Sequence, residues 1–206
     1  MINTETKSNN IKYCKNCVMP LSTVNLSINP EGVCSACEFH KVYQSITPEG
    51  WEERKKKFEN ILNEHKSQSN YDCIIPVSGG KDSYYQAHQI VEEFKLKPLL
   101  VTYDGNNYLP EGIYNRDKMR ENFDADHLIF GPSIKSLREL NKQCFKIMGD
   151  MNWHAHCGIY TYPFQVAVNF KIPLLIWGET FWDISGMYDV NAVSYTHLTL
   201  PTILLV

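Results

Sequence analysis

The sequence predicts an α/β protein built on a parallel, doubly wound sheet, with a small cysteine-rich segment before it. From Tyr71 onward, strand-like and helix-like segments alternate along the chain. The strand-like segments are short and continuously apolar, which is typical of strands covered on both faces. Each of them runs into a loop that contains glycine or aspartate. This alternation indicates parallel strands joined by helices, with the ligand site beyond the carboxyl ends of the strands.

Four strands and four helices are expected in this part of the chain. The strands are predicted at 72–77, 97–103, 127–130 and 172–177, and they run into Ser-Gly-Gly, Asp-Gly, Gly-Pro and Gly-Glu. Apolar residues at helical spacing predict helices at 82–95, 111–123, 133–149 and 158–170. One face of the third helix collects Ile134, Leu137, Leu140, Cys144 and Ile147. Cys144 on that face and Cys73 in the first strand are expected to be buried.

The composition excludes several classes of protein. The net charge of -3 and the pI of about 6.2 argue against a nucleic-acid partner, since proteins that grip long nucleic acids carry a basic excess. The basic run Arg54–Lys57 lies in a Glu-rich helical stretch and is expected on a solvated face. No apolar run approaches membrane-spanning length, and the polar start is no secretory signal. Seven cysteines without such a signal indicate a reducing, cytoplasmic setting.

The loop after the first strand is the strongest candidate site. Its residues are Ser78, Gly79, Gly80, Lys81, Asp82 and Ser83, between a strand and a helix. Glycines let the backbone approach a phosphate, and the N–H groups at a helix start attract anions. Ser78 and Ser83 would add hydroxyl donors and Lys81 a charge, while Asp82 would cap the helix or help to hold Mg²⁺. The pattern is not a Walker A loop, because Ile75 stands where that motif needs glycine.

Two C-x-x-C pairs predict a metal site in the cysteine-rich segment. Cys14 and Cys17 form the first pair, and Cys34 and Cys37 form the second. Two tight turns of this kind together supply a tetrahedral Cys₄ site. Zn²⁺ would then stabilise a segment that is too short and polar for a core. An iron–sulfur cluster is the alternative, and a closed Cys₄ site predicts no catalytic role.

Three further residues lie where the strands or helices would point into the site. Asp104 ends the second strand, and Glu179 follows the fourth. Cys157 precedes the predicted helix at 158–170, where it would be a nucleophile with a lowered pKa, part of a substrate wall or a simple helix cap. Trp182 and Asp183 are weaker candidates. For Glu179 the alternative is a solvated loop carboxylate.

The chain is expected to divide into five parts. They are a disordered lead at 1–12, the Cys₄ segment at 13–40 without helical periodicity, a linking helix at 50–68, the α/β domain at 70–190 and a tail at 191–206. The tail lacks the α/β texture and resembles a translated sequencing adapter, so it is expected to be foreign and to pack poorly against the sheet. The α/β domain would then lack its C-terminal part. A genuine edge strand is the alternative.

The Ser-Gly-Gly-x-Asp-Ser loop after an apolar strand resembles the signature of PP-loop ATP pyrophosphatases. The resemblance implies an adenine-nucleotide α-hydrolase-like fold, in which the loop holds the pyrophosphate that leaves when ATP adenylates a substrate oxygen. In that family the residue matching Asp104 contacts the base or ribose. Lys81 and Asp82, with Mg²⁺, would stabilise the leaving group, and Glu179 and Cys157 are candidates for catalysis.

The wider set of motifs resembles N-acetyl sugar amidotransferases of bacterial surface-polysaccharide and nonulosonic-acid pathways. It comprises Cys-Lys-Asn-Cys-Val-Met-Pro, Cys-Ser-Ala-Cys, Pro-Val-Ser-Gly-Gly-Lys-Asp-Ser, Cys-Gly-Ile-Tyr-Thr-Tyr-Pro and Ile-Trp-Gly-Glu, across residues 12–190. The resemblance implies that an acetamido group becomes an acetamidino group, with ammonia from a separate glutaminase subunit. The alternative is a tRNA sulfurtransferase, whose basic surface and paired catalytic cysteines are not evident. A non-enzymatic zinc-ribbon adaptor would not account for the loop at 78–83, called the phosphate loop below.

Overall fold

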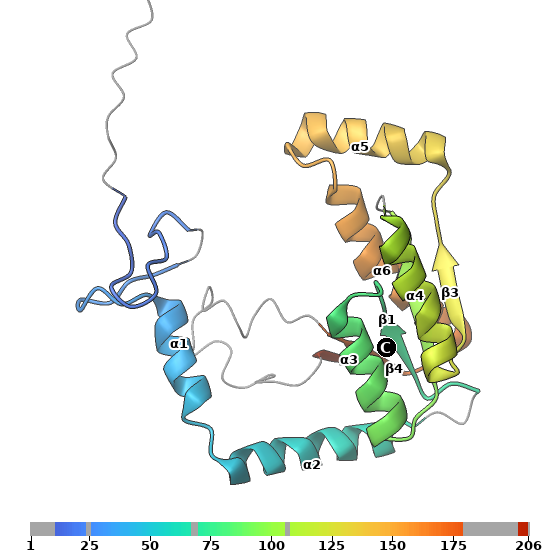
Figure 1. The fold of residues 1–206 in the computed structure, drawn as a ribbon, viewed down its shortest axis with the longest axis horizontal. Helices are drawn as coiled ribbons and strands as arrows, with labels where there is room; N and C mark the ends of the chain where they lie inside the picture. Colours follow the sequence, from blue (N-terminus) through green and yellow to red (C-terminus); the bar gives the residue numbers. More distant parts are fainter. Residues whose placement is uncertain (1–10, 24–25, 67–69, 106–107, 179–201, 206) are drawn as a thin grey trace, which may run out of the picture. The chain divides into compact units, whose positions relative to one another are not determined.

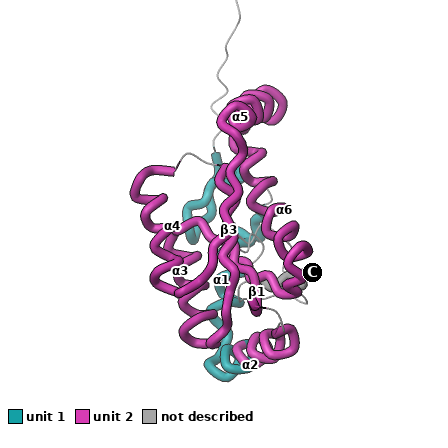
Figure 2. The backbone as a smooth tube through the Cα atoms, turned by 90° about the vertical axis from the view of Figure 1, so that its right-hand side faces the viewer, with its two compact units in different colours: residues 1–54, 180–199 teal, residues 55–179, 200–206 magenta. Residues whose placement is uncertain are grey.

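The computed structural model describes residues 11–23, 26–66, 70–105, 108–178 and 202–205 (Figure 1). The chain forms two compact units, residues 1–54 with 180–199 and residues 55–179 with 200–206 (Figure 2). The boundary between the units falls inside helix α2, Pro48–Glu64. Each unit is therefore described by itself.

The second unit contains the predicted parallel sheet. Its strands are β1 (Cys73–Pro76), β2 (Pro98–Tyr103), β3 (His127–Phe130) and β4 (Leu174–Trp177), in the order β3-β2-β1-β4. All three pairings among them are parallel, with Ile75 opposite Leu100 and Ile74 opposite Leu175. The chain thus builds outward from β1 to β3 and then crosses to the other side of β1, which is the doubly wound arrangement predicted from the sequence.

A fifth strand, β5 (Thr202–Leu205), lies antiparallel to β4 at the edge of the sheet. The expectation that no part of the tail matches a sheet partner is wrong for these four residues, which follow the edge-strand alternative. Residues 191–201 lie outside the described residues. The origin of the tail stays a prediction.

Helices cover both faces of the sheet. The second unit contains the C-terminal part of α2, then α3 (Lys81–His88) with a π-helical turn at Gln89–Glu93, α4 (Pro110–Phe123), α5 (Ile134–Met148) and α6 (Trp153–Phe170). One core joins α2, α3 and α4 to alternate residues of the strands, among them Ile75, Leu100 and Ile176. The other packs α6 against the opposite residues, such as Ile74, Val101 and Leu175. Cys73 is fully buried in the first of these cores, as expected.

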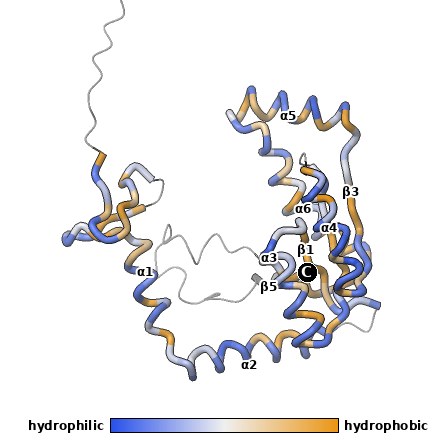
Figure 3. The backbone as a smooth tube through the Cα atoms, in the orientation of Figure 1, coloured by the Kyte–Doolittle hydropathy of each residue, from blue (hydrophilic) through white to orange (hydrophobic). Residues whose placement is uncertain are grey.

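The apolar face of α5 is less covered than its sequence suggests. Hydrophobic and hydrophilic residues alternate along the helix (Figure 3). Only Leu137 is buried, whereas Ile134 and Ile147 are 64% and 76% exposed. Cys144 is half-buried. The expectation that Cys144 is buried is therefore met only in part.

Two helix boundaries differ from prediction. Helix α6 begins at Trp153, whereas the apolar spacing predicts a start at 158, because the His- and Cys-rich stretch before it lacks that spacing. In the first unit, α1 (Ser35–Gln44) begins inside the Cys₄ segment, where no helix was expected. Isolated bridges between Tyr13 and Pro20 and between Ile28 and Cys34 complete that segment. Among the described residues, no helix has the length and apolar character needed to cross a membrane.

Candidate functional site

The phosphate loop lies at the switch point of the sheet. The direction of winding reverses between β1 and β4, so the carboxyl ends of these two strands border the crevice where doubly wound sheets bind ligands. Val77 extends the pairing of β1, since its N–H donates to the carbonyl of Val101 at 2.9 Å. The loop then leaves the sheet and enters α3, whose cap is Gly80. Strand, loop and helix thus follow one another as the sequence predicted.

Hydrogen bonds within the loop fix its shape. The hydroxyl of Ser83 donates to the carbonyl of Gly80 at 3.1 Å and accepts from the N–H of Ser78 at 3.2 Å. The N–H of Gly80 donates to Oγ of Ser78 at 3.3 Å. Ser83 is buried, so its hydroxyl braces the loop. Its predicted role as a direct phosphate donor does not match this geometry.

Gly79 is required by backbone conformation and by a close contact. Its φ of +81° is one that side chains disfavour. A Cβ here would also lie 2.7 Å from the backbone nitrogen of Arg116 in α4. Because that neighbour is backbone, it cannot rotate away. The loop is therefore seated directly on α4.

The first turn of α3 supplies unused donors at the mouth of the loop. Within the described part of the chain, no acceptor is found for the N–H groups of Lys81, Asp82 and Ser83. Such groups and the positive end of the helix dipole bind anions. The side chains of Lys81 and Asp82 form an exposed ion pair at 2.7 Å. Because both side chains are exposed, the Lys81 ammonium can exchange Asp82 for a phosphate. The Asp82 carboxylate is then an accessible oxygen ligand of the kind that Mg²⁺ prefers.

Asp104 lies beside the loop and is held by Arg116, a residue that no sequence motif indicates. Nη1 of Arg116 donates to Oδ2 of Asp104 at 2.9 Å, and the guanidinium lies 5.3 Å from the centre of the Tyr108 ring. The Arg116 side chain is 8% exposed and that of Asp104 31%. The sequence gives no signal for Arg116, since a charged residue in a polar helix is ordinarily solvated.

A second chain of hydrogen bonds reaches the loop from β3. Oγ1 of Thr102 donates to the carbonyl of Val77 at 2.5 Å and lies 2.8 Å from Nε2 of His127. Since that hydroxyl proton is already used, Nε2 of His127 donates and its Nδ1 carries the lone pair. Burial, followed by the charge of Arg116, lowers the pKa of His127 to about 4. The imidazole is therefore neutral at pH 7.

The start of α6 forms one wall near the end of β2. Gly158 lies against the ring of Tyr103, so a side chain at position 158 would overlap that ring. Burial, and then the neighbouring Cys157 thiol, raises the pKa of Tyr103. Cys157 is exposed and lies in the second turn of α6, so the expected position at the helix start is wrong. The wall continues from Tyr103 to Phe130 and Tyr162, with ring centres 5.9 and 5.4 Å apart.

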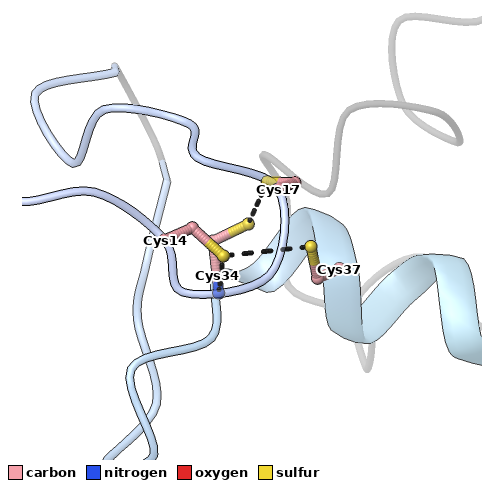
Figure 4. A group of neighbouring side chains, drawn as sticks. All are labelled: Cys14, Cys17, Cys34 and Cys37. Carbon is pink, nitrogen blue, oxygen red and sulfur yellow. Dashed lines mark hydrogen bonds between the residues drawn. The ribbon is translucent and has the colours of Figure 1, made fainter.

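The four cysteines of the two C-x-x-C pairs form one cluster in the first unit (Figure 4). Their sulfur atoms all lie within 4.8 Å of one another. Sγ of Cys14 lies 3.9 Å from Sγ of Cys37, and Sγ of Cys17 lies 3.6 Å from Sγ of Cys34. Four thiolates around one tetrahedral Zn²⁺ are about 3.8 Å apart, given Zn–S bonds of about 2.3 Å. These two sulfur–sulfur separations are close to this value.

Backbone donors support a thiolate at Cys14. The N–H groups of Asn16 and Cys34 each donate to its sulfur at 3.3 Å. Backbone hydrogen bonds, with that of Cys17 the largest contribution, lower the pKa of Cys14 to about 6. Burial instead raises the pKa of Cys34 to about 12. Cys14, Cys34 and Cys37 are buried and Cys17 is exposed, and a bound cation is what would allow all four sulfurs to be thiolates together.

The structure brings together many of the predicted residues. Ser78–Ser83 and Asp104 lie in the second unit around the ends of β1 and β2, with Cys157 in the wall beside β2, and the four cysteines meet in the first unit. Glu179, Trp182 and Asp183 lie outside the described residues. Gly178, just before Glu179, packs against the side chain of Gln86.

The fold and the loop define the class of this protein: a doubly wound parallel α/β domain with the Ser78–Ser83 loop at its switch point, preceded by a Cys₄ cluster. No known family profile matches the chain. It is 34% identical over 129 residues to an uncharacterized protein of Methanocaldococcus jannaschii, a match that covers 61% of this chain. The match covers 45% of the relative, so the chain spans less than half the length of that curated protein.

Three of the solved structures that match part of this chain are of enzymes. An NH3-dependent NAD synthetase from Campylobacter jejuni matches with a TM-score of 0.46 at 12% identity, over 63% of this chain and 57% of that one. An NMN synthetase from Francisella tularensis matches with 0.46 at 16% identity, over 63% and 54%. A U34-tRNA thiolase from Methanococcus maripaludis, solved with its 4Fe–4S cluster, matches with 0.39 at 18% identity, over 81% and 54%.

Proposed function

We propose that this chain is the nucleotide-binding part of a PP-loop enzyme that cleaves ATP to AMP and pyrophosphate. The observation that carries the proposal is the Ser78–Ser83 loop, which presents the N–H groups of the first turn of α3 at the switch point of the sheet. The internal braces by Ser78 and Ser83 keep these donors preorganised. Preorganised donors aimed at developing negative charge stabilise a leaving group without reorganisation.

Each residue of the loop then has a chemical task. A substrate oxygen attacks the α-phosphorus of ATP, the bond to the bridging oxygen breaks, and the electron pair leaves with pyrophosphate. The backbone N–H groups bind the pyrophosphate, and the Lys81 ammonium stabilises the negative charge that develops on it. Mg²⁺, held by the phosphates with help from Asp82, would neutralise part of that charge.

We propose further that the substrate is an N-acetylated sugar and the product its acetamidino derivative. The amide oxygen would be adenylated, and ammonia would then add to the amide carbon and displace AMP. The sequence motifs support this choice, and so does the aromatic wall of Tyr103, Phe130 and Tyr162, since aromatic faces suit the apolar face of a sugar ring. A glutaminase subunit would deliver the ammonia.

The Cys₄ cluster is proposed to hold one structural Zn²⁺. The sulfur separations near 3.8 Å and the N–H donors at Cys14 favour a single tetrahedral ion. With four thiolates as ligands, such an ion has no open position and performs no chemistry on the substrate.

A product assay tests the proposal. The chain is incubated with ATP, Mg²⁺, ammonia and candidate N-acetyl sugars, and the products are resolved by chromatography and mass spectrometry. The expected products are AMP, pyrophosphate and a sugar that carries an amidine. ADP as the main nucleotide product would refute the loop assignment. Sulfur transfer to tRNA in place of amidine formation would identify a tRNA sulfurtransferase instead.

A further inference from the structure

Arg116 is a buried cation next to the phosphate loop. Its side chain is 8% exposed, although it lies on α4 between the exposed residues Asn115 and Asp117. Removing a guanidinium from water costs several kcal/mol unless charged partners compensate, and an apolar side chain of similar size would serve packing equally well. The reason for a charge at this position therefore lies in the groups that Arg116 contacts.

The ion pair that Arg116 makes is unequally exposed. Its partner Asp104 keeps 31% of its side chain accessible at the end of β2. Nη1 of Arg116 donates a hydrogen bond to Oδ2 of Asp104 at 2.9 Å. Among the described residues, no donor lies within hydrogen-bonding distance of Oδ1. The ring of Tyr108 and the carboxylate of Asp117, 3.4 Å from Nε, fix the guanidinium from other sides. The arrangement orients one carboxylate, whose second oxygen has no donor within the described part of the chain.

The backbone of the same residue supports the phosphate loop. A Cβ atom added to Gly79 would lie 2.7, 2.8 and 2.9 Å from N, Cα and Cβ of Arg116. Arg116 thus contacts the loop through its backbone and Asp104 through its side chain. One residue of α4 therefore contacts both the phosphate loop and the Asp104 carboxylate.

We propose that Arg116 is a positioning residue that aims the Asp104 carboxylate at the nucleoside part of ATP while its backbone supports the loop that holds the phosphates. This inference rests on the proposed ATP-binding function. The side chain of Arg116 would serve the nucleoside end of ATP and its backbone the phosphate end. Both contacts exist before ATP binds, so binding needs little further ordering of the protein. Removing the guanidinium should harm recognition of the nucleoside and spare recognition of pyrophosphate.

A merely structural ion pair would behave differently. If Arg116 only stabilised the fold, its loss would loosen α4 and weaken every ligand of the loop alike. Binding of inorganic pyrophosphate, which has no nucleoside, therefore separates the two roles. Binding of AMP reports on the nucleoside end.

Isothermal titration of ATP, AMP and pyrophosphate into the full chain tests the proposal. The variants are Arg116→Met, Asp104→Asn and the double variant, with Arg116→Lys as a conservative replacement. Arg120→Met, an exposed arginine one turn later on α4, is the matched control. Arg116→Met and Asp104→Asn should each weaken ATP and AMP roughly tenfold to a hundredfold, the loss of one hydrogen bond to a charged group. Pyrophosphate affinity should stay unchanged.

The double variant should bind ATP no more weakly than Asp104→Asn alone, because both changes remove the same interaction. Arg116→Lys should recover part of the affinity, and Arg120→Met should match the wild type. Additive losses of ATP affinity in the double variant, or equal losses for pyrophosphate and ATP, would overturn this inference. The proposed function would still stand, because the wild-type chain would still bind ATP. A wild-type chain that binds neither ATP nor pyrophosphate would overturn the proposed function, and this inference with it.

Discussion

The two units of this chain are held together in different ways. The α/β unit has two hydrophobic cores, one on each face of its sheet, with residues such as Ile74, Ile75 and Leu100 fully buried. In the Cys₄ segment the buried cluster consists of Cys14, Cys34 and Cys37, against which only half-buried residues pack. Burial of a few small side chains does not offset the conformational entropy of ordering such a segment. The proposed Zn²⁺ would supply the stability that the core does not.

The comparison separates stability from function. In the α/β unit the apolar strands maintain the fold, while the residues at their carboxyl ends are free to bind a ligand. In the Cys₄ segment the residues with chemical reactivity are the same ones that maintain the fold. Disturbing the first unit should therefore change structure, and disturbing the loop of the second should change chemistry.

Removal of the metal should have the largest effect. Structural zinc contributes roughly 10–16 kcal/mol of binding free energy in short peptides, and this becomes folding free energy. Cys34→Ser should abolish zinc binding and unfold residues 13–40, while the α/β unit stays folded. Elemental analysis should find about one zinc per wild-type chain, and hydrogen exchange should show lost protection in the first unit alone.

Cys144→Ser is the matched control for that variant, because Cys144 lies on α5 outside the cluster. It should keep the zinc and the protection pattern. Iron in the purified chain, or an intact Cys₄ segment without metal, would contradict the assignment of a structural zinc.

The loop should respond in rate rather than in structure. Lys81→Ala should lower kcat by roughly 10²-fold or more with a smaller effect on the KM for ATP, since the charge matters most as pyrophosphate leaves. The exposed side chain of Lys81 contributes little packing, so thermal stability should stay near that of the wild type. Steady-state kinetics with ATP and Mg²⁺ varied separately measure both parameters. A change in KM alone would refute the transition-state role.

Asp82→Ala sharpens the same test. If the carboxylate helps to hold Mg²⁺, the variant should need more metal to reach half its maximal rate. If Asp82 only stabilises the start of α3, its loss should reduce stability by about 0.5–2 kcal/mol and leave the metal dependence as it was.

Gly79→Ala should combine strain and a clash with the backbone of Arg116. A left-handed conformation costs roughly 1–2 kcal/mol for a residue with a side chain. Gly149→Ala is the matched control, because its φ is +72° and no atom lies within 4 Å of the added methyl group. Gly79→Ala should therefore lose more stability than the control and should also lose affinity for pyrophosphate. Equal losses in urea titration would show that the contact with α4 is unimportant.

Much of the fold follows from the sequence alone. The four parallel strands lie within or at the predicted ranges because continuous apolar runs bounded by glycine or aspartate have few other solutions. The phosphate loop and the cysteine pairs were predicted because their spacing is tied to their chemistry. The start of α6 was missed, since a polar stretch with His154, His156 and Gly158 resembles a loop until tertiary packing is known.

Contacts between distant residues account for what the sequence could not predict. Arg116 is 37 residues from Gly79 along the chain, yet it contacts both the loop and Asp104. His127 had been placed only in a strand, and its link to Val77 passes through Thr102 on the neighbouring strand. Register and helix docking create these neighbours, and no local pattern reports them.

The last prediction concerns His127, whose effect should be absent at pH 7 and should appear as a dependence of stability on pH. Burial and the nearby charges of Arg116 and Arg120, opposed by Asp117, lower the pKa of this histidine to about 4, from an ordinary value of 6.5. Between these values the unfolded chain binds the proton and the folded chain does not. Its contribution to stability is therefore complete above pH 6.5 and is lost as the pH falls toward 4, by about 2 kcal/mol at pH 5.

His127→Gln should remove this dependence, because the glutamine amide can still donate to Thr102 but cannot be protonated. Urea titrations of both proteins at pH 7.5 and pH 5.0 should show that the variant loses less stability on acidification than the wild type does. His88→Gln, on the exposed side of α3, is the control and should keep the wild-type dependence. If His127→Gln were as acid-sensitive as the wild type, protonation of His127 would not be the cause of the pH dependence of stability.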